Sequence, residues 1–327
     1  MNANLPKAIH ELLAQDGLTD LFINGANQVW ALQESGQVLR LPSPFADASE
    51  LAECAMQLAA CDSKRLDLSV PFADISLPGG IRVHAVLASS CSPQTLISIR
   101  VHKSHAASID ELIAAGFATS AQAAYLRQML AERRSFLISG PTGSGKTTLL
   151  RSLLAECRND RVVILEDTPE VAIDSDRWVG LRTRQANVEG RGAIDLQSLV
   201  VESLRMKPDR IVIGEVRSSE LVPLLQALNT GHGGSAATLH SNSLTDVPNR
   251  LLAIGKTAGL DAWVLSELAS SAISCVIQLA ITEGKRKIEA IGEFSKSKQG
   301  WLAIEPIAFA PHLQLVPAAE TQQLMFA

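Results

Sequence analysis

Long apolar runs and aromatic residues are scarce in this sequence, and each absence limits what the chain can be. No stretch of about 18 uninterrupted apolar residues occurs, so no segment is expected to span a membrane. Residues 1–17 lack the apolar run and small-residue cleavage site of a secretory signal. Aromatic residues make up 4% of the 327 residues, so the core has to be built mainly from aliphatic side chains. We therefore expect a cytoplasmic protein with an aliphatic core.

Cysteine is scarce as well, and its spacing argues against a structural metal site. The five cysteines are odd in number and include no CxxC pair, which disfavours both a zinc site and a disulfide framework. Cys54 and Cys157 fall on apolar helical patterns and are interpreted as buried thiols. The cysteine pattern is typical of a protein in a reducing compartment.

Basic residues are not in excess in either part of the chain. Residues 1–104 carry 7 basic and 10 acidic side chains and the remainder carries 22 and 24, which gives a net charge of −5. A protein that holds nucleic acid by neutralising phosphates needs a basic excess. The composition therefore argues against a nucleic-acid partner.

The first third of the chain has the pattern of a small α+β domain. Short segments at 21–23, 28–32, 38–41, 72–77, 81–87 and 96–101 predict strands, and residues 48–62 have helical spacing. The polar stretch 103–110 lacks periodicity and is interpreted as a linker. We therefore expect an N-terminal domain over residues 1–104 and a second domain over residues 105–327.

Beyond residue 110 the pattern changes to buried strands that alternate with helices. Apolar runs at 135–138, 161–165 and 210–213 are typical of buried parallel strands, and 147–157 and 194–205 have helical spacing. This alternation predicts an α/β domain with a doubly wound, mostly parallel sheet.

The segment that follows the first of these strands reads GPTGSGKT and fits the phosphate-binding pattern GxxxxGK[ST]. Its glycines let backbone N–H groups approach phosphate oxygens, and the next helix presents its positive N-terminal end. The lysine reaches the β- and γ-phosphates, and the threonine hydroxyl ligates Mg²⁺. A glycine-rich turn with one solvated lysine is the alternative. The sequence predicts an ATP site at Gly140, Pro141, Thr142, Gly143, Ser144, Gly145, Lys146, Thr147 and Thr148.

Two further strands run into acidic residues. Glu166 and Asp167 follow one strand, and Glu215 follows another after Gly214. The carboxyl ends of strands in an open α/β sheet face the ligand, so these carboxylates are expected beside the nucleotide. A carboxylate there can deprotonate the attacking water, and Glu215 fits the Walker B acid that supports Mg²⁺ together with Thr147. Turn-capping or salt-bridged acids are the alternative interpretation.

Two of the seven histidines, His232 and His240, flank a predicted strand in the segment GHGGSAATLH. No Cys, His or acidic partner at metal-ligand spacing accompanies them. On the residues alone, two interpretations stay open: core or surface histidines with satisfied hydrogen bonds, or histidines that sense the nucleotide.

In this order and spacing, the four features resemble the secretion ATPases of the type II/type IV superfamily, and the similarity covers nearly the whole chain. Residues 204–217 are similar to the family's Walker B region, 164–170 to its acidic box and 231–240 to its His box. Residues 182–190 and 227–232 are most similar to the tight-adherence (Flp/tad) pilus and conjugal-transfer branches. The chain departs from the family at Gly233, where many relatives keep Asp, and at Pro223, which is expected to interrupt a helix.

The resemblance implies a RecA-like P-loop domain and a role for each motif. Glu166 corresponds to the general base, and Glu215 to the residue that supports Mg²⁺ and the water. His232 and His240 correspond to residues that sense or position the γ-phosphate, and Lys146 to the catalytic lysine of the P-loop.

The resemblance also implies how the chain works as a motor. Arg82 and Arg100 of the N-terminal domain would contact the nucleotide, although an arginine on a strand is by itself more typical of a solvated edge. ATP binding would then close the two domains within a hexameric ring. The ring would dock on inner-membrane platform proteins and power pilus assembly, secretion or conjugal transfer, at the inner face of the membrane without spanning it.

Two functions of other kinds are weighed against this motor. One is a DNA-translocating P-loop ATPase, which the acidic balance and few aromatics disfavour. The other is a nucleotide-binding assembly regulator with little turnover, which the intact P-loop lysine and both strand-end acids disfavour. A GTPase is disfavoured by the absence of an Asn-Lys-x-Asp motif.

Overall fold

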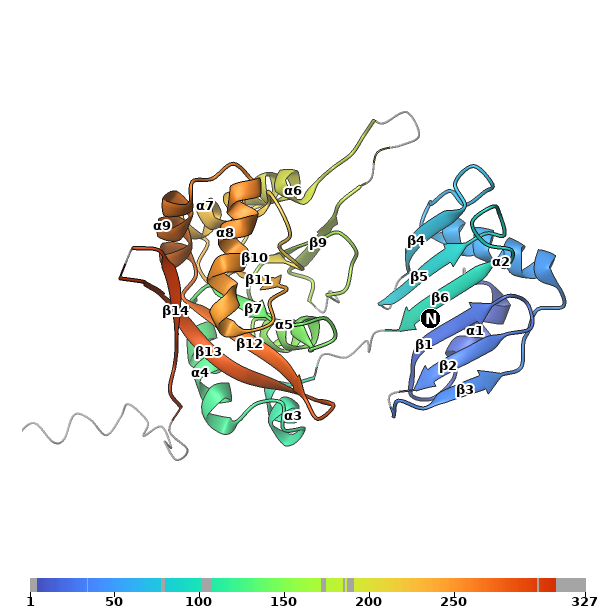
Figure 1. Ribbon diagram of the computed structural model, residues 1–327, viewed down its shortest axis with the longest axis horizontal. Coiled ribbons are helices and arrows are strands. Elements are labelled where there is room, and N and C mark those ends of the chain that lie inside the picture. Colours follow the sequence, from blue (N-terminus) through green and yellow to red (C-terminus); the bar gives the residue numbers. More distant parts are fainter. Residues whose placement is uncertain are drawn as a thin grey trace, which may run out of the picture. The chain divides into compact units, whose positions relative to one another are not determined.

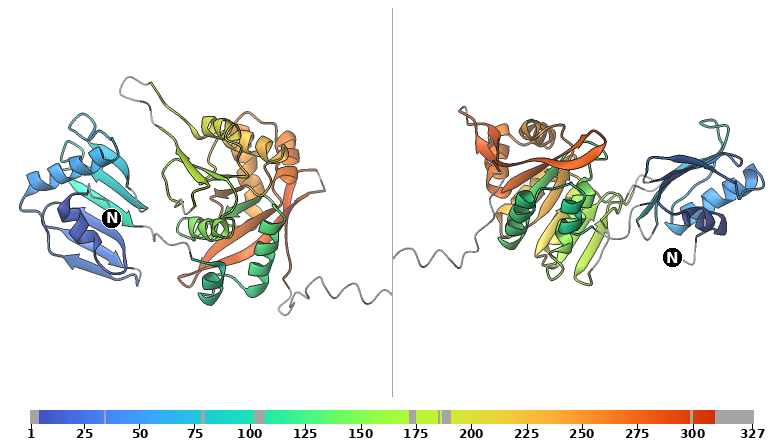
Figure 2. Two further views of the ribbon diagram at one scale, coloured as in Figure 1. Left: turned by 180° about the vertical axis from the view of Figure 1, so that it is seen from behind. Right: turned by 90° about the horizontal axis from the view of Figure 1, so that it is seen from below.

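The computed structural model describes residues 5–33, 35–77, 80–101, 107–171, 175–184, 186, 191–298 and 300–309 (Figures 1 and 2). It divides into two compact units, Met1–His105 with Thr168–Ala172, and Ala106–Asp167 with Ile173–Ala327. Each unit is described by itself, and the domain boundary between residues 104 and 105 stays a prediction. Residues 78–79 between the expected strands at 72–77 and 81–87, residues 103–106 of the expected linker, and positions 185 and 187–190 lie outside the described residues.

The first unit combines one antiparallel sheet with two helices. Its elements are α1 (Lys7–Leu13), β1 (Leu18–Asn24), β2 (Val29–Gln33), β3 (Val38–Leu41), α2 (Ala48–Cys61), β4 (Phe72–Leu77), β5 (Ile81–Val86) and β6 (Leu96–Val101). The strand order is β3-β2-β1-β6-β5-β4. Side chains alternate along each strand, so Leu21, Val83 and Ile99 share one buried face. The α+β pattern predicted for this part of the chain is confirmed.

The second unit is built around an eight-stranded sheet. Its strands are β7 (Phe136–Ser139), β8 (Val162–Glu166), β9 (Trp178–Arg182), β10 (Arg210–Ile213), β11 (Ala236–Leu239), β12 (Cys275–Thr282), β13 (Lys285–Lys296) and β14 (Leu302–Pro306). The order is β14-β13-β12-β7-β11-β10-β8-β9. All neighbours from β12 to β9 are parallel, while β13 and β14 add an antiparallel edge. The predicted mostly parallel sheet is confirmed.

Helices cover both faces of this sheet (Figures 1 and 2). They are α3 (Ile109–Ala114), α4 (Ser120–Ala131), α5 (Lys146–Ala155), α6 (Leu196–Leu204), α7 (Leu221–Asn229), the short 3₁₀ turn η1 (Leu244–Asp246), α8 (Val247–Thr257) and α9 (Ala262–Ala272). Alternate residues of the central strands, such as Val163, Ile211 and Ala237, form one aliphatic core with α6 to α9. α4 and α5 lie together on the other face, where α5 packs on β7 and β11. The sheet is therefore doubly wound, as predicted.

The expected linker ends sooner than its composition indicates. The Ser108 hydroxyl accepts the backbone N–H of Glu111, and the Glu111 carboxylate accepts the backbone N–H of Ser108. This reciprocal capping starts α3 at Ile109. The linker prediction was wrong at 108–110 because the polar residues that cap a helix have the same composition as a linker.

Pro223 does not interrupt the helix after Walker B, contrary to expectation. α7 begins at Leu221, which places Pro223 in its first turn. Backbone N–H groups in the first turn have no helical partner, so the proline removes no hydrogen bond there. The helix is continuous from Leu221 to Asn229.

None of the five cysteines forms a disulfide, and Cys54 and Cys157 are buried as predicted. Burial raises the pKa of the Cys54 thiol to about 12 and also raises that of Cys157. Both thiols are therefore unreactive core groups. Among the described residues, no helix has both the length and the apolar character needed to cross a bilayer.

Candidate active site

All the predicted site residues of the second unit except His232 converge, because four parallel strands end at one edge of the sheet. β7, β8, β10 and β11 are neighbours in the order β7-β11-β10-β8. The P-loop follows β7, and Glu166 is the last residue of β8. Glu215 and His240 lie just beyond the ends of β10 and β11. Sequence segments separated by up to a hundred residues therefore meet at the carboxyl edge, where open α/β sheets bind ligands.

The P-loop depends on glycines with left-handed backbone conformations. Gly143 has φ of 76° and Gly145 has φ of 95°, values that residues with a side chain seldom adopt. Gly145 also caps α5, and a Cβ there would lie 3.2 Å from the Phe117 ring. The Ser144 hydroxyl is fully buried, with no hydrogen-bond partner among the described residues. A buried hydroxyl of this kind is suited to a ligand oxygen.

Lys146 is held at the centre of the site. It is the first residue of α5 and its side chain is buried, with 8% exposed. Its Nζ donates to the carbonyl oxygens of Gly140 at 2.9 Å and Pro141 at 3.0 Å, and lies 3.2 Å from Nδ1 of His240. The ammonium group therefore lies inside the loop, where a phosphate would compete for it.

His240 links Lys146 to Glu215. Its Nε2 lies 3.1 Å from Oε1 of Glu215. Burial, and then the positive charge of Lys146, hold the pKa of His240 below its usual value. A neutral ring that accepts at Nδ1 from Lys146 donates its Nε2–H to Glu215. His240 thus lies beside the P-loop, where the family resemblance, but not the residues alone, implied a phosphate-contacting histidine.

Glu215 stays ionised in this setting. Burial raises the pKa of its carboxyl, but the hydrogen bond from Arg217 and the nearby positive charges of Arg217 and Lys146 outweigh that effect. The net result is a pKa below the ordinary value. Glu215 and the Thr147 hydroxyl are oxygen ligands of the kind that Mg²⁺ takes when phosphates and waters complete its shell, so this donor set fits the ion.

Glu166 reaches the same place across a glycine. Its side chain is buried with 6% exposed, and a Cβ added to Gly214 would lie 2.8 Å from its Cγ. No larger residue than glycine fits at position 214 while Glu166 keeps this position. The glycine that displaces the Walker B acid by one residue therefore makes room for the proposed base.

Arg217 belongs to the site but was not chosen from the sequence. Its Nη2 donates to Oε2 of Glu215 at 2.6 Å, and its Nη1 lies 3.8 Å from Oδ2 of Asp167. The buried Glu220 carboxylate accepts the backbone N–H groups of Arg217 and Ser218 and fixes this turn. The sequence signal that could have identified Arg217 is its position two residues after the Walker B acid.

Gln278 is a second residue that motif analysis missed. It is fully buried on β12, and its Oε1 accepts the Ser139 hydroxyl at 2.5 Å. Its Nε2 donates to the carbonyls of Leu279 at 3.2 Å and Ser241 at 3.4 Å. Gln278 thereby joins the end of β7 to the loop after His240. It belongs to no motif, so no sequence signal was available.

The structure does not bring His232 to this group. His232 precedes β11 and His240 follows it, so the two histidines lie at opposite ends of that strand. The Nδ1 of His232 lies 3.1 Å from the carbonyl oxygen of Ala227 at the end of α7. The pairing of both histidines at one phosphate is therefore not seen within this chain.

The Gly233 departure has a packing reason. A Cβ at Gly233 would lie 3.0 Å from the carbonyl oxygen of Arg133, and one at Gly234 would lie 2.4 Å from Nη1 of Arg210. A side chain at Gly233 would therefore press on the Arg133 backbone, and one at Gly234 would displace the Arg210 guanidinium.

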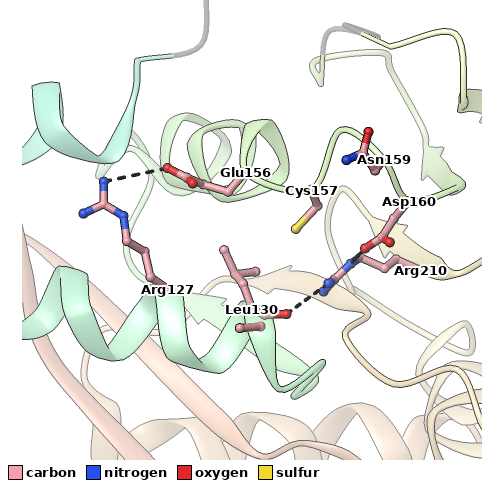
Figure 3. A pocket seen from close by; sticks show the side chains of 8 residues that line it. Arg127, Leu130, Glu156, Cys157, Asn159, Asp160 and Arg210 are labelled. Carbon is pink, nitrogen blue, oxygen red and sulfur yellow. Dashed lines mark hydrogen bonds and ion pairs between the residues drawn. The ribbon is translucent and has the colours of Figure 1, made fainter. Parts of the chain in front are cut away.

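A pocket of about 320 Å³ lies at the amino edge of the sheet, at the opposite end of α5 from the P-loop (Figure 3). Arg210 is almost fully buried there. Its Nε lies 2.6 Å from Asp160, its Nη1 donates to Gly234 O at 2.8 Å, and its Nη2 donates to Leu130 O at 3.1 Å. The pocket contains none of the predicted site residues, and its charges pair with one another.

Arg82 and Arg100 face each other on adjacent strands of the first unit. β5 pairs with β6 so that Arg82 lies directly opposite Arg100, and Asp20 of β1 lies opposite Arg100 on its other side. The Arg100 Nε lies 3.0 Å from Oδ1 of Asp20, and Arg82 forms an ion pair with Glu170. The two predicted arginines therefore form one cross-strand pair.

Acidification should destabilise the second unit through His240. Because the folded chain lowers the pKa of this imidazole, the unfolded chain binds its proton more readily as the pH falls through the ordinary histidine range. The free energy of unfolding therefore decreases. When the pH is lowered from about 7.5 to 5, the Tm of His240→Gln in thermal unfolding should fall by less than the Tm of the wild type. His10→Gln serves as the control, and equal losses in wild type and His240→Gln would contradict the expectation.

Comparison with known proteins agrees with this geometry. A family model described as type II/IV secretion system protein matches residues 4–298. The chain is 38% identical over 291 residues to a putative conjugal transfer protein of Mycobacterium tuberculosis, covering 86% of this chain and 82% of the relative. It is 32% identical over 276 residues to the probable conjugal transfer protein TrbB of Sinorhizobium fredii, covering 81% and 82%.

The fold is also found among solved structures. The pilus retraction motor PilT with bound ADP superposes with a TM-score of 0.63 at 16% identity, covering 94% of this chain and 83% of PilT. At this identity the likeness concerns the fold, and the predicted RecA-like class is confirmed. The family match over most of the sequence and the 38% identical relative show that this chain belongs to the type II/IV secretion system protein family.

Proposed function

We propose that this chain hydrolyses Mg-ATP at the carboxyl edge of the second unit. The observation that carries the proposal is the connected group Lys146–His240–Glu215 beside the P-loop. These are a cation for the β- and γ-phosphates, a neutral imidazole and an ionised carboxylate. Phosphoryl transfer needs mainly positioning and charge stabilisation, and this arrangement supplies both.

Glu166 is the general base in this proposal. It lies over Gly214 and next to the Walker B acid, at the end of its own strand. From there a carboxylate can orient and deprotonate a water directed at the γ-phosphate. Mg²⁺, when bound by Thr147, Glu215 and the phosphates, supplies charge neutralisation. Arg217 keeps the Glu215 carboxylate ionised and oriented.

The mechanical part of the proposal rests on the family. Arg82 and Arg100 complete the site when ATP closes the first unit on the second, within a hexameric ring. The ring docks on inner-membrane platform proteins at the cytoplasmic face and powers pilus assembly, secretion or conjugal transfer. Conjugal transfer has direct support from the names of two relatives.

One set of measurements on the purified full-length chain tests these elements. ATP turnover should require Mg²⁺ and fall to background with excess EDTA. The double variant Arg82→Ala with Arg100→Ala should lose about tenfold or more in turnover without a change in Tm. Sedimentation of the chain in the presence of ATP should show a hexamer. Absence of Mg-dependent turnover would refute the ATPase, and turnover that needs single-stranded DNA would favour a DNA translocase.

A further inference from the structure

The hairpin between β12 and β13 reaches the P-loop and carries positive charge. β12 is parallel to β7, so its carboxyl end emerges at the same sheet edge as the P-loop. The chain then turns through Glu283 and Gly284, which both have positive φ, at 52° and 76°. Lys285 and Arg286 follow at once on β13. The strand order thus places two exposed cations near the loop.

Only one of these two cations contacts the P-loop among the interactions of the described residues. The Arg286 Nε donates to the carbonyl oxygen of Gly143 at 2.8 Å. Its Cδ would lie 3.7 Å from a Cβ on Gly145, so the side-chain stem also covers the start of α5. Lys285 instead lies opposite Thr282 across the hairpin.

The contact determines which way a P-loop N–H group points. In a trans peptide the C=O and N–H bonds point in opposite directions. Holding the Gly143 oxygen therefore directs the Ser144 N–H to the other side of the same peptide. That N–H donates across the loop to the carbonyl of Pro141 at a long 3.3 Å. A phosphate oxygen is a stronger acceptor and would take it over.

The β13 strand is itself anchored beside the loop. The Ile288 N–H donates to the carbonyl of Phe117 at 2.7 Å, and the ring of Phe117 packs against Gly145. Arg286 therefore starts from a fixed strand rather than a free surface position. The backbone of Arg286 is thus already ordered, and the contact with Gly143 costs only the side-chain entropy of Arg286.

We infer that Arg286 is a positioning residue that orients the Gly143–Ser144 peptide for phosphate binding. The inference rests on the proposed nucleotide site and adds to it a residue outside every motif. Its effect should be confined to ligands that carry phosphates, because an N–H group of the P-loop is a donor for phosphate oxygens.

Nucleotide titration of the full chain tests this role with three variants. Arg286→Met removes the donor and should raise the Kd for fluorescent ADP about tenfold. Arg286→Lys keeps a donor and charge and should stay within about threefold of wild type. Lys285→Met, the neighbouring cation, is the matched control and should bind as wild type does. In competition with fluorescent ADP, the affinity of pyrophosphate should fall by the same factor in Arg286→Met, whereas the affinity of adenosine should not change.

The outcomes separate this inference from the proposed function. Wild-type-like binding by Arg286→Met would overturn it, as would an equal loss in Lys285→Met, which would indicate a long-range charge effect. An equal loss in Arg286→Lys with unchanged Tm would also count against it. If wild type itself bound no ADP, the proposed nucleotide site would fail instead.

Discussion

Lys146→Ala should strongly weaken nucleotide binding and raise the Kd for ATP by about a hundredfold or more. Lys146 supplies the buried cation inside the P-loop, held by two carbonyls and His240. Without it the phosphates meet only backbone N–H groups, and charge-assisted hydrogen bonds to phosphate are among the strongest that a site offers. Titration with a fluorescent ATP analogue, with Mg²⁺ present, measures the effect.

The matched control is Lys298→Ala, which removes an exposed lysine of the same unit. It should leave both the Kd and the turnover unchanged. Thermal unfolding without nucleotide shows whether Lys146→Ala is folded. A folded Lys146→Ala chain that still binds ATP tightly would refute the P-loop assignment.

Glu166→Gln should lower kcat by about a hundredfold or more while nucleotide binding is kept. The amide preserves the size of the side chain over Gly214 but cannot accept the proton of the attacking water. General-base catalysis contributes typically about 10²–10⁴-fold, which sets the expected loss. Single-turnover hydrolysis measures the chemical step separately from product release.

Asp167→Asn is the control for the proposed base. Asp167 is the adjacent acid, but its side chain is exposed, accepts from Thr183 at 3.2 Å and lies near Arg217. Its replacement should change kcat by less than about threefold, because it is not placed over the site. If Asp167→Asn were the inactive variant and Glu166→Gln the active one, the base would have to be reassigned.

The motif residues of the second unit could be found from sequence because their signals are local. A glycine pattern between a buried strand and a helix identifies Gly140–Thr147, and a strand that ends in a carboxylate identifies Glu166 and Glu215. Each signal lies within about ten residues, so it survives without knowledge of the strand order. A local signal also gave the wrong linker end at Ser108, because the residues that cap α3 have the composition of a linker.

The sequence by itself determined the α/β class, the P-loop and the acids beside it, because periodicity and motif spacing are properties of contiguous residues. Only the tertiary structure decided which of the two histidines joins the site, and that Arg217, Gln278 and Arg286 belong around it. The choice of histidine depends on which end of β11 lies beside the P-loop, and the places of Gln278 and Arg286 depend on the pairing of β12 with β7. Strand order follows from packing between segments far apart in the chain, and local patterns do not encode it.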